Sequence, residues 1–120
     1  MSEIERCRPW IEAALEYSGG THLFEDIEAG ILSGRFQLWP APDACMVTEI
    51  VVYPRKKVLN GFLAGGNLET LKAMYASVEA WGAAQGCSAA TVSGRKGWER
   101  VWAREGWAPL HTTLAKEIGT

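Results

Sequence analysis

Residues 58–67, Val-Leu-Asn-Gly-Phe-Leu-Ala-Gly-Gly-Asn, decide the fold of this chain. The apolar run Val58–Leu63 is typical of a strand, and Gly65-Gly66 ends it. Asn67 is a favourable helix N-cap. Apolar side chains then recur at helical spacing, at Leu68, Leu71, Tyr75 and Val78. The segment therefore predicts a strand that turns directly into a long helix, which Gly86 ends.

The dipeptide Asn60-Gly61 lies inside this predicted strand. A glycine within a strand usually marks a bulge or a close approach of another backbone. Asn-Gly is also a common hairpin turn, but the flanking segments would then be short. We therefore favour a bulged strand.

Working outward, the sequence predicts the order helix, helix, three strands, long helix, strand, helix, strand. A strand that is followed by a helix and another strand requires parallel pairing, whereas the earlier strands can form an antiparallel meander. We expect a mixed sheet. The expected elements are a helix over 3–17, a helix capped by Thr21 that runs through Leu32, strands Phe36–Trp39, Cys45–Tyr53 and Val58–Leu63, the helix from Asn67, a strand Ser88–Val92, a helix Lys96–Glu105 ended by Gly106, and a strand Trp107–Ile118.

The length of 120 residues predicts a single domain over residues 1–120. The net charge of −2 argues against a general nucleic-acid binder, although Arg55-Lys56-Lys57 forms a basic turn. The three cysteines are far apart, which favours free thiols in a reducing compartment. No apolar run is long enough to span a membrane and no signal peptide is evident, so we expect an intracellular protein. His22 and His111 lack neighbours at ligand spacing, and we expect no metal site.

The predicted order resembles the GNAT (N-acetyltransferase) superfamily over most of the chain. The resemblance rests on the strand Val58–Leu63 running into Gly65-Gly66-Asn67 and a long helix, and on Gly106-Trp107 after the last helix. It implies a GNAT-like α/β fold, with a mixed central sheet flanked by helices on both faces. The bulge at Asn60-Gly61 would splay that sheet to admit a pantetheine arm.

Three shorter segments are similar to small GNAT-like proteins of tailed phages and prophage-like elements. They are Thr48-Glu49-Ile50, Tyr53-Pro54-Arg55 and Gly94–Arg100. This resemblance implies a phage-related origin, in the host cytoplasm or inside a phage-like particle. Together with the divergence of residues 62–67 from the family's phosphate loop and with Trp102 in the position of its Tyr, it leads us to expect a non-catalytic structural or assembly protein that binds a protein partner, such as another virion component, and needs no cofactor.

The alternative function is an acetyl-CoA-dependent N-acetyltransferase. The family's pyrophosphate loop, Arg/Gln-x-x-Gly-x-Gly/Ala, falls on residues 62–67, where only Gly65 matches. One interpretation is that amides of this loop bind the phosphates at the start of a helix. The other, which we favour, is a tight turn with an Asn cap. The candidate cofactor-binding residues are Leu63, Ala64, Gly65, Gly66 and Asn67.

Acetyl transfer needs a base for the ammonium and usually an acid for the leaving thiolate. Glu49 is the candidate base, although it could equally be a solvent-facing residue or a partner of Arg95. The family's acid is often a Tyr four residues before the helix-ending Gly. Trp102 stands there, and an indole N–H is not an acid near neutral pH. Tyr53 or Tyr75 could supply a phenol instead.

The last predicted helix carries a Trp-rich side and a basic side. The chain has six Trp, and not all can be fully buried in so small a domain. One interpretation is a core-facing aromatic side with a solvated basic side, and the other is a docking surface. The candidate partner-binding residues are Arg95, Lys96, Trp98, Arg100 and Arg104.

Overall fold

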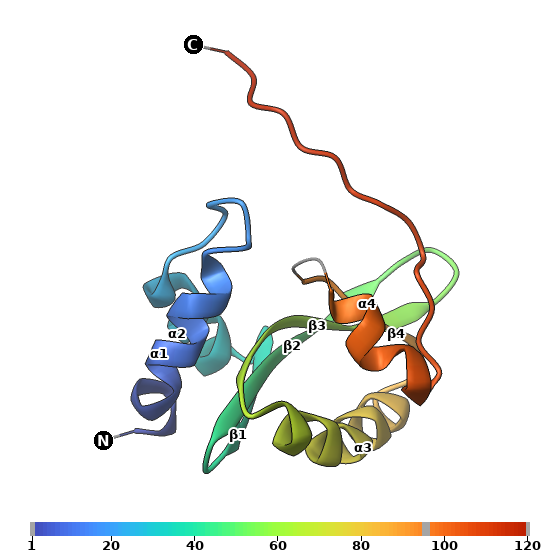
Figure 1. Ribbon diagram of the computed structural model, residues 1–120, viewed down its shortest axis with the longest axis horizontal. Coiled ribbons are helices and arrows are strands. Elements are labelled where there is room, and N and C mark those ends of the chain that lie inside the picture. Colours follow the sequence, from blue (N-terminus) through green and yellow to red (C-terminus); the bar gives the residue numbers. More distant parts are fainter. Residues whose placement is uncertain (1, 95–96, 120) are drawn as a thin grey trace.

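The structure is a computed structural model that describes residues 2–94 and 97–119. A four-stranded sheet carries helices on both faces (Figure 1). The elements are α1 (Glu3–Leu15), α2 (Phe24–Ser33), β1 (Phe36–Ala41), β2 (Ala44–Val52), β3 (Lys57–Gly66), α3 (Leu68–Ala84), β4 (Cys87–Val92), α4 (Trp98–Trp102) and the 3-10 turn η1 (Ala103–Glu105).

The strands lie in the order β1-β2-β3-β4. The first two pairs are antiparallel, and β3 pairs in parallel with β4, with α3 as the crossover between them. The mixed sheet expected from the sequence is confirmed.

One face of the sheet is covered by α1 and α2 (Figure 1). The spacing of Cys7, Ile11 and Leu15 places them on one side of α1, and all three are buried. They form a core with Cys45 and Val47 of β2. This core fixes the end of α1 beside β3.

The long helix α3 covers the opposite face. Its buried residues Leu71 and Val78 pack on Met46 and Leu59 of the sheet. Asn67 is its N-cap, as expected, because the Thr70 N–H donates to Asn67 Oδ1 at 3.0 Å.

The expected bulge is present in β3. Val47 of β2 lies opposite Leu63, but the next residue, Thr48, lies opposite Gly61. Phe62 is therefore the extra residue on the bulged strand. The alternative of a hairpin turn at Asn60-Gly61 is wrong, because β3 continues through it to Gly66.

Two predicted elements differ from the structure near their ends. Thr21 does not cap α2, which begins at Phe24, and the Asp26 carboxylate instead accepts from the Leu23 N–H at 2.8 Å. The last predicted helix ends before Gly106, as expected, but only Trp98–Trp102 is α-helical and Ala103–Glu105 forms the 3-10 turn η1; its predicted first residue, Lys96, lies outside the described residues.

The predicted final strand Trp107–Ile118 is wrong for this structure. Residues 107–119 contain no helix or strand and extend away from the sheet (Figure 1). A strand requires hydrogen bonds from a neighbouring strand, and none lies beside this segment in the described chain.

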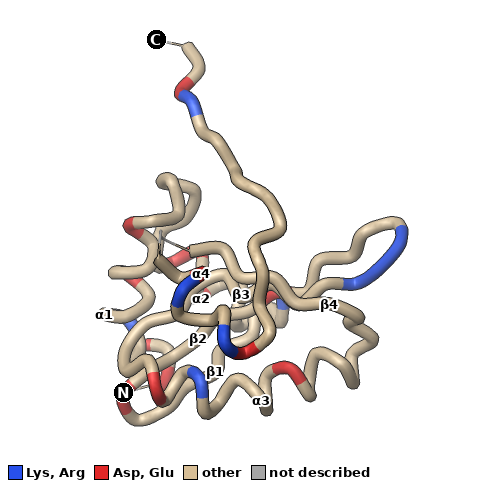
Figure 2. Tube along the Cα trace, turned by 45° about the vertical axis from the view of Figure 1, so that its right-hand side comes forward, with Lys and Arg blue, Asp and Glu red and all other residues tan. Residues whose placement is uncertain are grey.

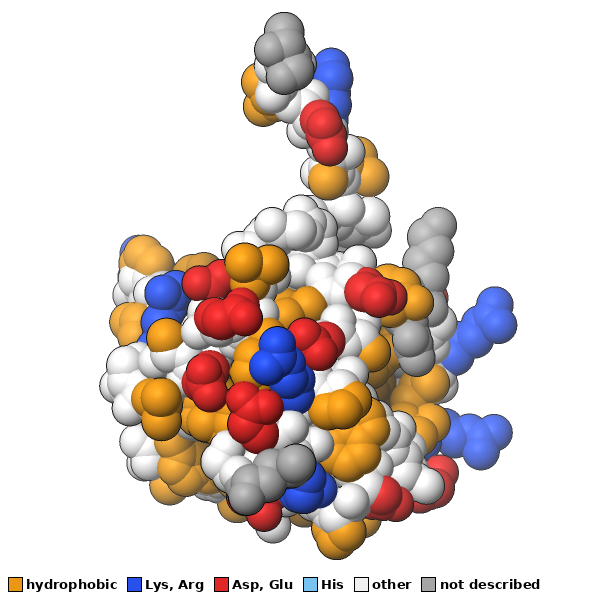
Figure 3. All heavy atoms as spheres, turned by 90° about the vertical axis from the view of Figure 1, so that its left-hand side faces the viewer, with side chains coloured by type: hydrophobic (Ala, Val, Ile, Leu, Met, Phe, Trp, Pro, Cys, Tyr) orange, Lys and Arg blue, Asp and Glu red, His pale blue; other side chains and the backbone are white. Residues whose placement is uncertain are grey.

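Charge is distributed unevenly over the surface. Arg8 of α1 lies 3.3 to 4.0 Å from carboxylates of Glu5, Glu12 and Glu25. Figure 3 shows acidic and basic side chains gathered together on one face of the molecule. The basic turn between β2 and β3 lies at the tip of a projecting hairpin (Figure 2).

The three cysteines are free. Among the described residues, no helix is both long and apolar enough to cross a membrane.

Candidate functional site

A cleft opens where β3 and β4 part. Their parallel pairing ends at Gly61 and Val92, and the last hydrogen bond runs from the Ser93 N–H to the Gly61 carbonyl oxygen at 3.4 Å. Beyond that point β3 continues through the bulge residue Phe62, and its residues 63–66 pair with β2 alone among the described strands. The cleft beside this open edge has a volume of about 530 Å³. This volume suits a small ligand.

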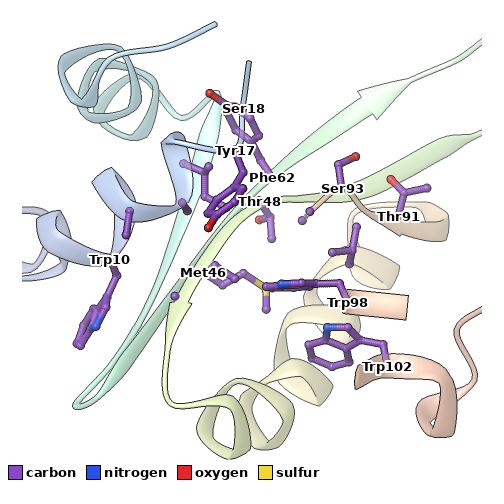
Figure 4. Close-up of a pocket in the computed structure, with 18 of the residues that line it drawn as sticks. Trp10, Tyr17, Ser18, Met46, Thr48, Phe62, Thr91, Ser93, Trp98 and Trp102 are labelled. Carbon is purple, nitrogen blue, oxygen red and sulfur yellow. The ribbon is translucent and has the colours of Figure 1, made fainter. Parts of the chain in front are cut away.

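Residues from several parts of the chain line the cleft (Figure 4). Trp10 of α1 and Tyr17, just after that helix, lie on one side, and Trp98 and Trp102 of α4 lie on the other. Met46 of β2 lies between them. The walls are thus largely aromatic and apolar, with a few hydroxyl groups from Thr48, Ser93 and Thr91.

Four rings form what we call the aromatic floor: Tyr75, Trp98, Trp102 and Trp107. Tyr75 of α3 meets Trp102 and Trp107 edge-on, with centroids 5.8 and 5.4 Å apart. Trp98 lies against Trp102 at 6.2 Å. Such contacts stabilise the packing of α4 and of residue 107 on α3. The cluster accounts for three of the six Trp residues in the chain.

Two polar groups of the aromatic floor are buried without a hydrogen-bond partner among the described residues. They are the Tyr75 hydroxyl and the Trp102 indole N–H. A buried donor that is left unpaired costs about 1–3 kcal/mol, so proteins rarely retain one without a reason. Both residues line the cleft, although the two polar atoms themselves are covered by their neighbours, so an acceptor atom of a ligand would reach them only after the surrounding rings move.

Burial raises the pKa of Tyr75 above its ordinary value, and Glu79, one helical turn away, adds to the effect through its negative charge and through hydrogen bonding to the protonated phenol, although the two groups do not meet the geometry of a hydrogen bond in this conformation. The phenol is therefore protonated at neutral pH and acts as a donor. Sequence reasoning named Tyr75 as a possible phenol but had no signal that it faces a cleft. Its contacts with two distant Trp residues exist only in the folded chain.

The candidate loop Leu63–Asn67 lies along the cleft, but its glycines have a packing role. Gly65 lies against Trp10, whose Cβ would be 2.9 Å from a Cβ placed at residue 65. Gly66 has φ +99°, and a Cβ there would overlap the Asp43 carbonyl oxygen. The same oxygen accepts from the Asn67 N–H at 2.8 Å. The geometry accounts for this loop as a tight turn with a cap, and phosphate binding by it stays a prediction.

Glu49 does not line the cleft. Its carboxylate accepts from Asn60 Nδ2 at 3.3 Å, and Asn60 Oδ1 accepts from the Thr91 hydroxyl at 3.0 Å. These residues form one row across β2, β3 and β4. Only Thr91 of the row reaches the cleft. The expected alternative partner of Glu49, Arg95, lies outside the described residues.

The structure places the candidate partner-binding residues in different environments. Trp98 is half-buried and lines the cleft, whereas Arg100 and Arg104 are exposed. Neither arginine has an ion-pair partner in the part of the chain that is described. Arg95 and Lys96 lie outside it.

Thr48 is a cleft residue that sequence reasoning missed. Its hydroxyl donates to Gln37 Oε1 and accepts from the Trp39 indole, both at 2.9 Å. Because its hydrogen bonds are already made within the sheet, it positions the cleft wall.

The described residues contain no group of three or more His, Cys, Asp or Glu side chains arranged to hold a metal ion.

Comparison with solved structures identifies the fold class. A protein described as a probable acetyltransferase matches with a TM-score of 0.71 and 8% identity, over 98% of this chain and 93% of that chain. The BH1408 protein from Bacillus halodurans, as a tetramutant, matches with a TM-score of 0.67 and 12% identity, over 97% and 92%. TTHA1254 from Thermus thermophilus, as a point mutant, matches with a TM-score of 0.64 and 16% identity, over 98% and 93%.

Neither protein-family models nor curated protein sequences match the chain. The solved structures show that the chain has an acetyltransferase-like fold of the GNAT type. The fold class expected from the sequence is confirmed. At these identities the likeness concerns the fold alone.

Proposed function

We propose that the cleft binds an acyl thioester on an extended arm of the pantetheine type, with acetyl-CoA as the simplest such ligand. The observation that carries the proposal is the pair of buried donors without partners, the Tyr75 hydroxyl and the Trp102 indole N–H. A thioester or amide carbonyl oxygen between the cleft walls would accept from them once the rings that cover these atoms move aside. The ligand would thereby remove the cost of leaving these donors unpaired.

The open edge of β3 supports an extended ligand. Residues 63–66 pair with β2 on one side only, so the backbone on the cleft side can bind a chain that contains amides, as a strand edge binds a peptide. A pantetheine arm contains two amides. Met46 and Trp98 provide apolar surface for its methylene groups.

The phosphate end of such a ligand fits the structure less well. The Asn67 N–H already donates to Asp43, and the space above Gly66 is filled by residues 43 and 44. The start of α3 still offers the positive end of a helix dipole. We infer that most of the affinity comes from the arm and that the nucleotide adds little.

Thermal unfolding in the presence of defined ligands tests the proposal. Acetyl-CoA and acetyl-pantetheine should both raise the melting temperature, because each binds the native state only. Adenosine 3′,5′-bisphosphate, which lacks the arm, should leave the melting temperature unchanged. No shift with millimolar acetyl-CoA would contradict the proposal, and a shift with the nucleotide alone would contradict the assignment of affinity to the arm.

Acetyl transfer to an amine is a second candidate, favoured by the position of Tyr75 in the cleft. The amine nitrogen would form a bond to the thioester carbon, the carbon–sulfur bond would break, and the protonated phenol would donate its proton to the departing thiolate. Glu49 would take the ammonium proton through bridging water, since its carboxylate does not line the cleft. Under this candidate, Tyr75→Phe lowers turnover without abolishing acetyl-CoA binding. Equal turnover by the wild-type protein and the variant would exclude the acid role.

A third candidate is the role expected from the phage resemblance, a non-catalytic assembly protein that docks through the basic side of α4. The exposed, unpaired Arg100 and Arg104 favour it. Arg100→Glu should then abolish capture of a virion component from a particle lysate, whereas Arg55→Glu, a matched change on the distant hairpin, should not. Unchanged capture by Arg100→Glu would exclude this face as the contact.

A further inference from the structure

The hairpin that joins β2 and β3 ends in residues 52–57, which we call the hairpin tip. Val52 is 70% exposed and Tyr53 is 55% exposed, and the side chains of Arg55 and Lys56 are exposed beside them. The two strands pair as far as Val52, and the Tyr53 N–H donates to the Lys56 carbonyl oxygen at 2.9 Å, which closes the turn. The tip is therefore a preformed projection (Figure 2).

The positive charge of the hairpin tip is not neutralised by the chain around it. Residues 50–68 contain no Asp or Glu. Neither Arg55 nor Lys56 has an ion-pair partner in the part of the chain that the structure describes. The tip thus combines free cations with an exposed tyrosine, and Arg and Tyr are both enriched where proteins contact one another.

The two helices α1 and α2, which we call the helical layer, carry the opposite charge. Residues 3–33 contain seven carboxylates and two arginines, a net charge of −5, while the whole chain has −2, so the rest of the chain has +3. Along α2, Glu25, Glu28 and Leu32 recur at helical spacing, and Leu32 is 76% exposed. Figure 3 views the side on which this layer lies and shows acidic side chains with apolar side chains between them.

We propose that the hairpin tip of one copy of this chain docks on the helical layer of a second copy. Arg55 and Lys56 then meet the carboxylates of α2, and Tyr53 meets the exposed Leu32. A second copy is favoured over a nucleic acid because the helical layer offers both carboxylates and an exposed leucine, whereas the negative net charge of the chain repels a nucleic acid.

The positions of the two surfaces determine the kind of assembly. The helical layer lies at the left of Figure 1, and the hairpin that joins β2 and β3 projects at the right. Each copy therefore uses its tip on one neighbour and its helical layer on another. Such a contact is heterologous, and it forms open chains of copies unless the rotation between neighbours closes a ring.

Light scattering over a series of protein concentrations tests the association. Exposed ion pairs are individually weak and are screened by salt, so we expect weak association that is strongest at low ionic strength. The mean mass should rise above 13.1 kDa with protein concentration at about 20 mM salt and return to 13.1 kDa at about 500 mM salt. A mass of 13.1 kDa at every concentration, or association that salt does not weaken, would overturn the proposal.

Charge reversal on each surface locates the contact. Lys56→Glu changes the tip alone and Glu28→Lys changes the helical layer alone, and each variant by itself should stay at 13.1 kDa at low salt. Arg100→Glu and Glu117→Lys are the matched controls, since they change the net charge equally at exposed positions elsewhere and should associate like the wild type. Unchanged melting curves show that the variants fold. Association that survives either Lys56→Glu or Glu28→Lys would contradict the proposed contact.

An equimolar mixture of Lys56→Glu and Glu28→Lys identifies which surfaces meet. The unaltered tip of Glu28→Lys can dock on the unaltered helical layer of Lys56→Glu, so the mean mass should rise again. It should not exceed twice 13.1 kDa, because the remaining tip and layer are both altered. A mixture that stays at 13.1 kDa would show that tip and layer do not meet, and the proposal would be wrong.

A different occupant of the tip would give a different result. If the wild-type chain stays monomeric but binds single-stranded DNA or anionic vesicles, and Lys56→Glu removes that binding, then the tip contacts another anionic surface and the docking of a second copy is wrong. None of these results depends on the ligand of the cleft.

Discussion

The two ends of the cleft differ in whether their polar groups are paired within the protein. At one end, which we call the glycine end, Gly65, Gly66 and Asn67 have close packing contacts and the Asn67 N–H has a backbone partner. At the other end, the aromatic floor holds two buried donors without partners among the described residues. The glycine end has its backbone donor paired within the protein, whereas the aromatic floor retains two unpaired donors. This difference is the reason for proposing that a ligand contacts the aromatic floor rather than the glycine end.

The largest expected effect is at Gly66. Gly66→Ala should lower the free energy of unfolding by about 3 kcal/mol, because the new Cβ would meet the Asp43 oxygen and the positive φ is strained for alanine. Gly19→Ala is the control, since Gly19 has φ +76° but open space around it, and it should cost about 1 kcal/mol. Denaturant unfolding measures both. Equal losses of unfolding free energy in Gly66→Ala and Gly19→Ala would show that close packing is not the reason for a glycine at position 66.

Tyr75→Phe should have different effects on stability and on ligand binding at the aromatic floor. Removing a buried hydroxyl without a partner should leave the free energy of unfolding unchanged or raise it by up to about 1 kcal/mol. The same change should weaken acetyl-CoA binding about tenfold, because a donor to the ligand is lost. Calorimetry and thermal melts measure the two effects. Tyr53→Phe, at a residue that is 55% exposed, should change neither, and an unchanged affinity in Tyr75→Phe would show that the phenol does not contact the ligand.

Two substitutions of Asn67 distinguish its role as a helix cap from a role in binding phosphate. Asn67→Ala should cost about 1 kcal/mol of stability through loss of the bond to the Thr70 N–H. Asn67→Asp keeps the cap and should be nearly neutral for stability. Its added charge would weaken a contact to diphosphate. If acetyl-CoA affinity falls in Asn67→Asp while acetyl-pantetheine affinity does not, the glycine end does bind phosphate.

The smallest expected effect is a pH dependence. Because the folded-state pKa of Tyr75 lies above its unfolded value near 10, the folded state retains this proton as pH rises. The stabilisation is therefore present in full below about pH 10 and is lost as pH increases above it. Wild-type stability should fall more steeply than that of Tyr75→Phe in this alkaline range. The raised pKa of Cys45 acts in the same direction but is common to both proteins, so it cancels in the difference. Parallel curves would contradict the burial of the hydroxyl.

Much of the fold followed from local sequence. Asn67 as a cap, the bulge beside Gly61, the crossover through α3 and the helix end at Gly106 each depend on the backbone preferences of one or two residues. Such preferences act within a few positions along the chain, which is why they could be predicted. The start of α2 was misplaced because both Thr21 and Asp26 can satisfy a helix start, and only packing decides between them.

The site was less predictable, for a physical reason. Glu49 was chosen by its strand position, yet its carboxylate is held by Asn60 outside the cleft. Tyr75, Trp102 and Trp107 come from three separate segments, and their convergence depends on how α4 packs on α3. No spacing in the sequence encodes that contact.

The sequence by itself determined the order of elements, the bulge and the turn into α3, because these depend on local preferences. It also marked residues 107–118 as strand-like. Only the tertiary structure decided that the glycines of the turn pack against Trp10 and Asp43, and that two donors meet unpaired in a cleft of the described chain. It also left the tail beside none of the described strands of its own chain. Burial and pairing join residues that are far apart in sequence, so they are settled only when the chain has folded.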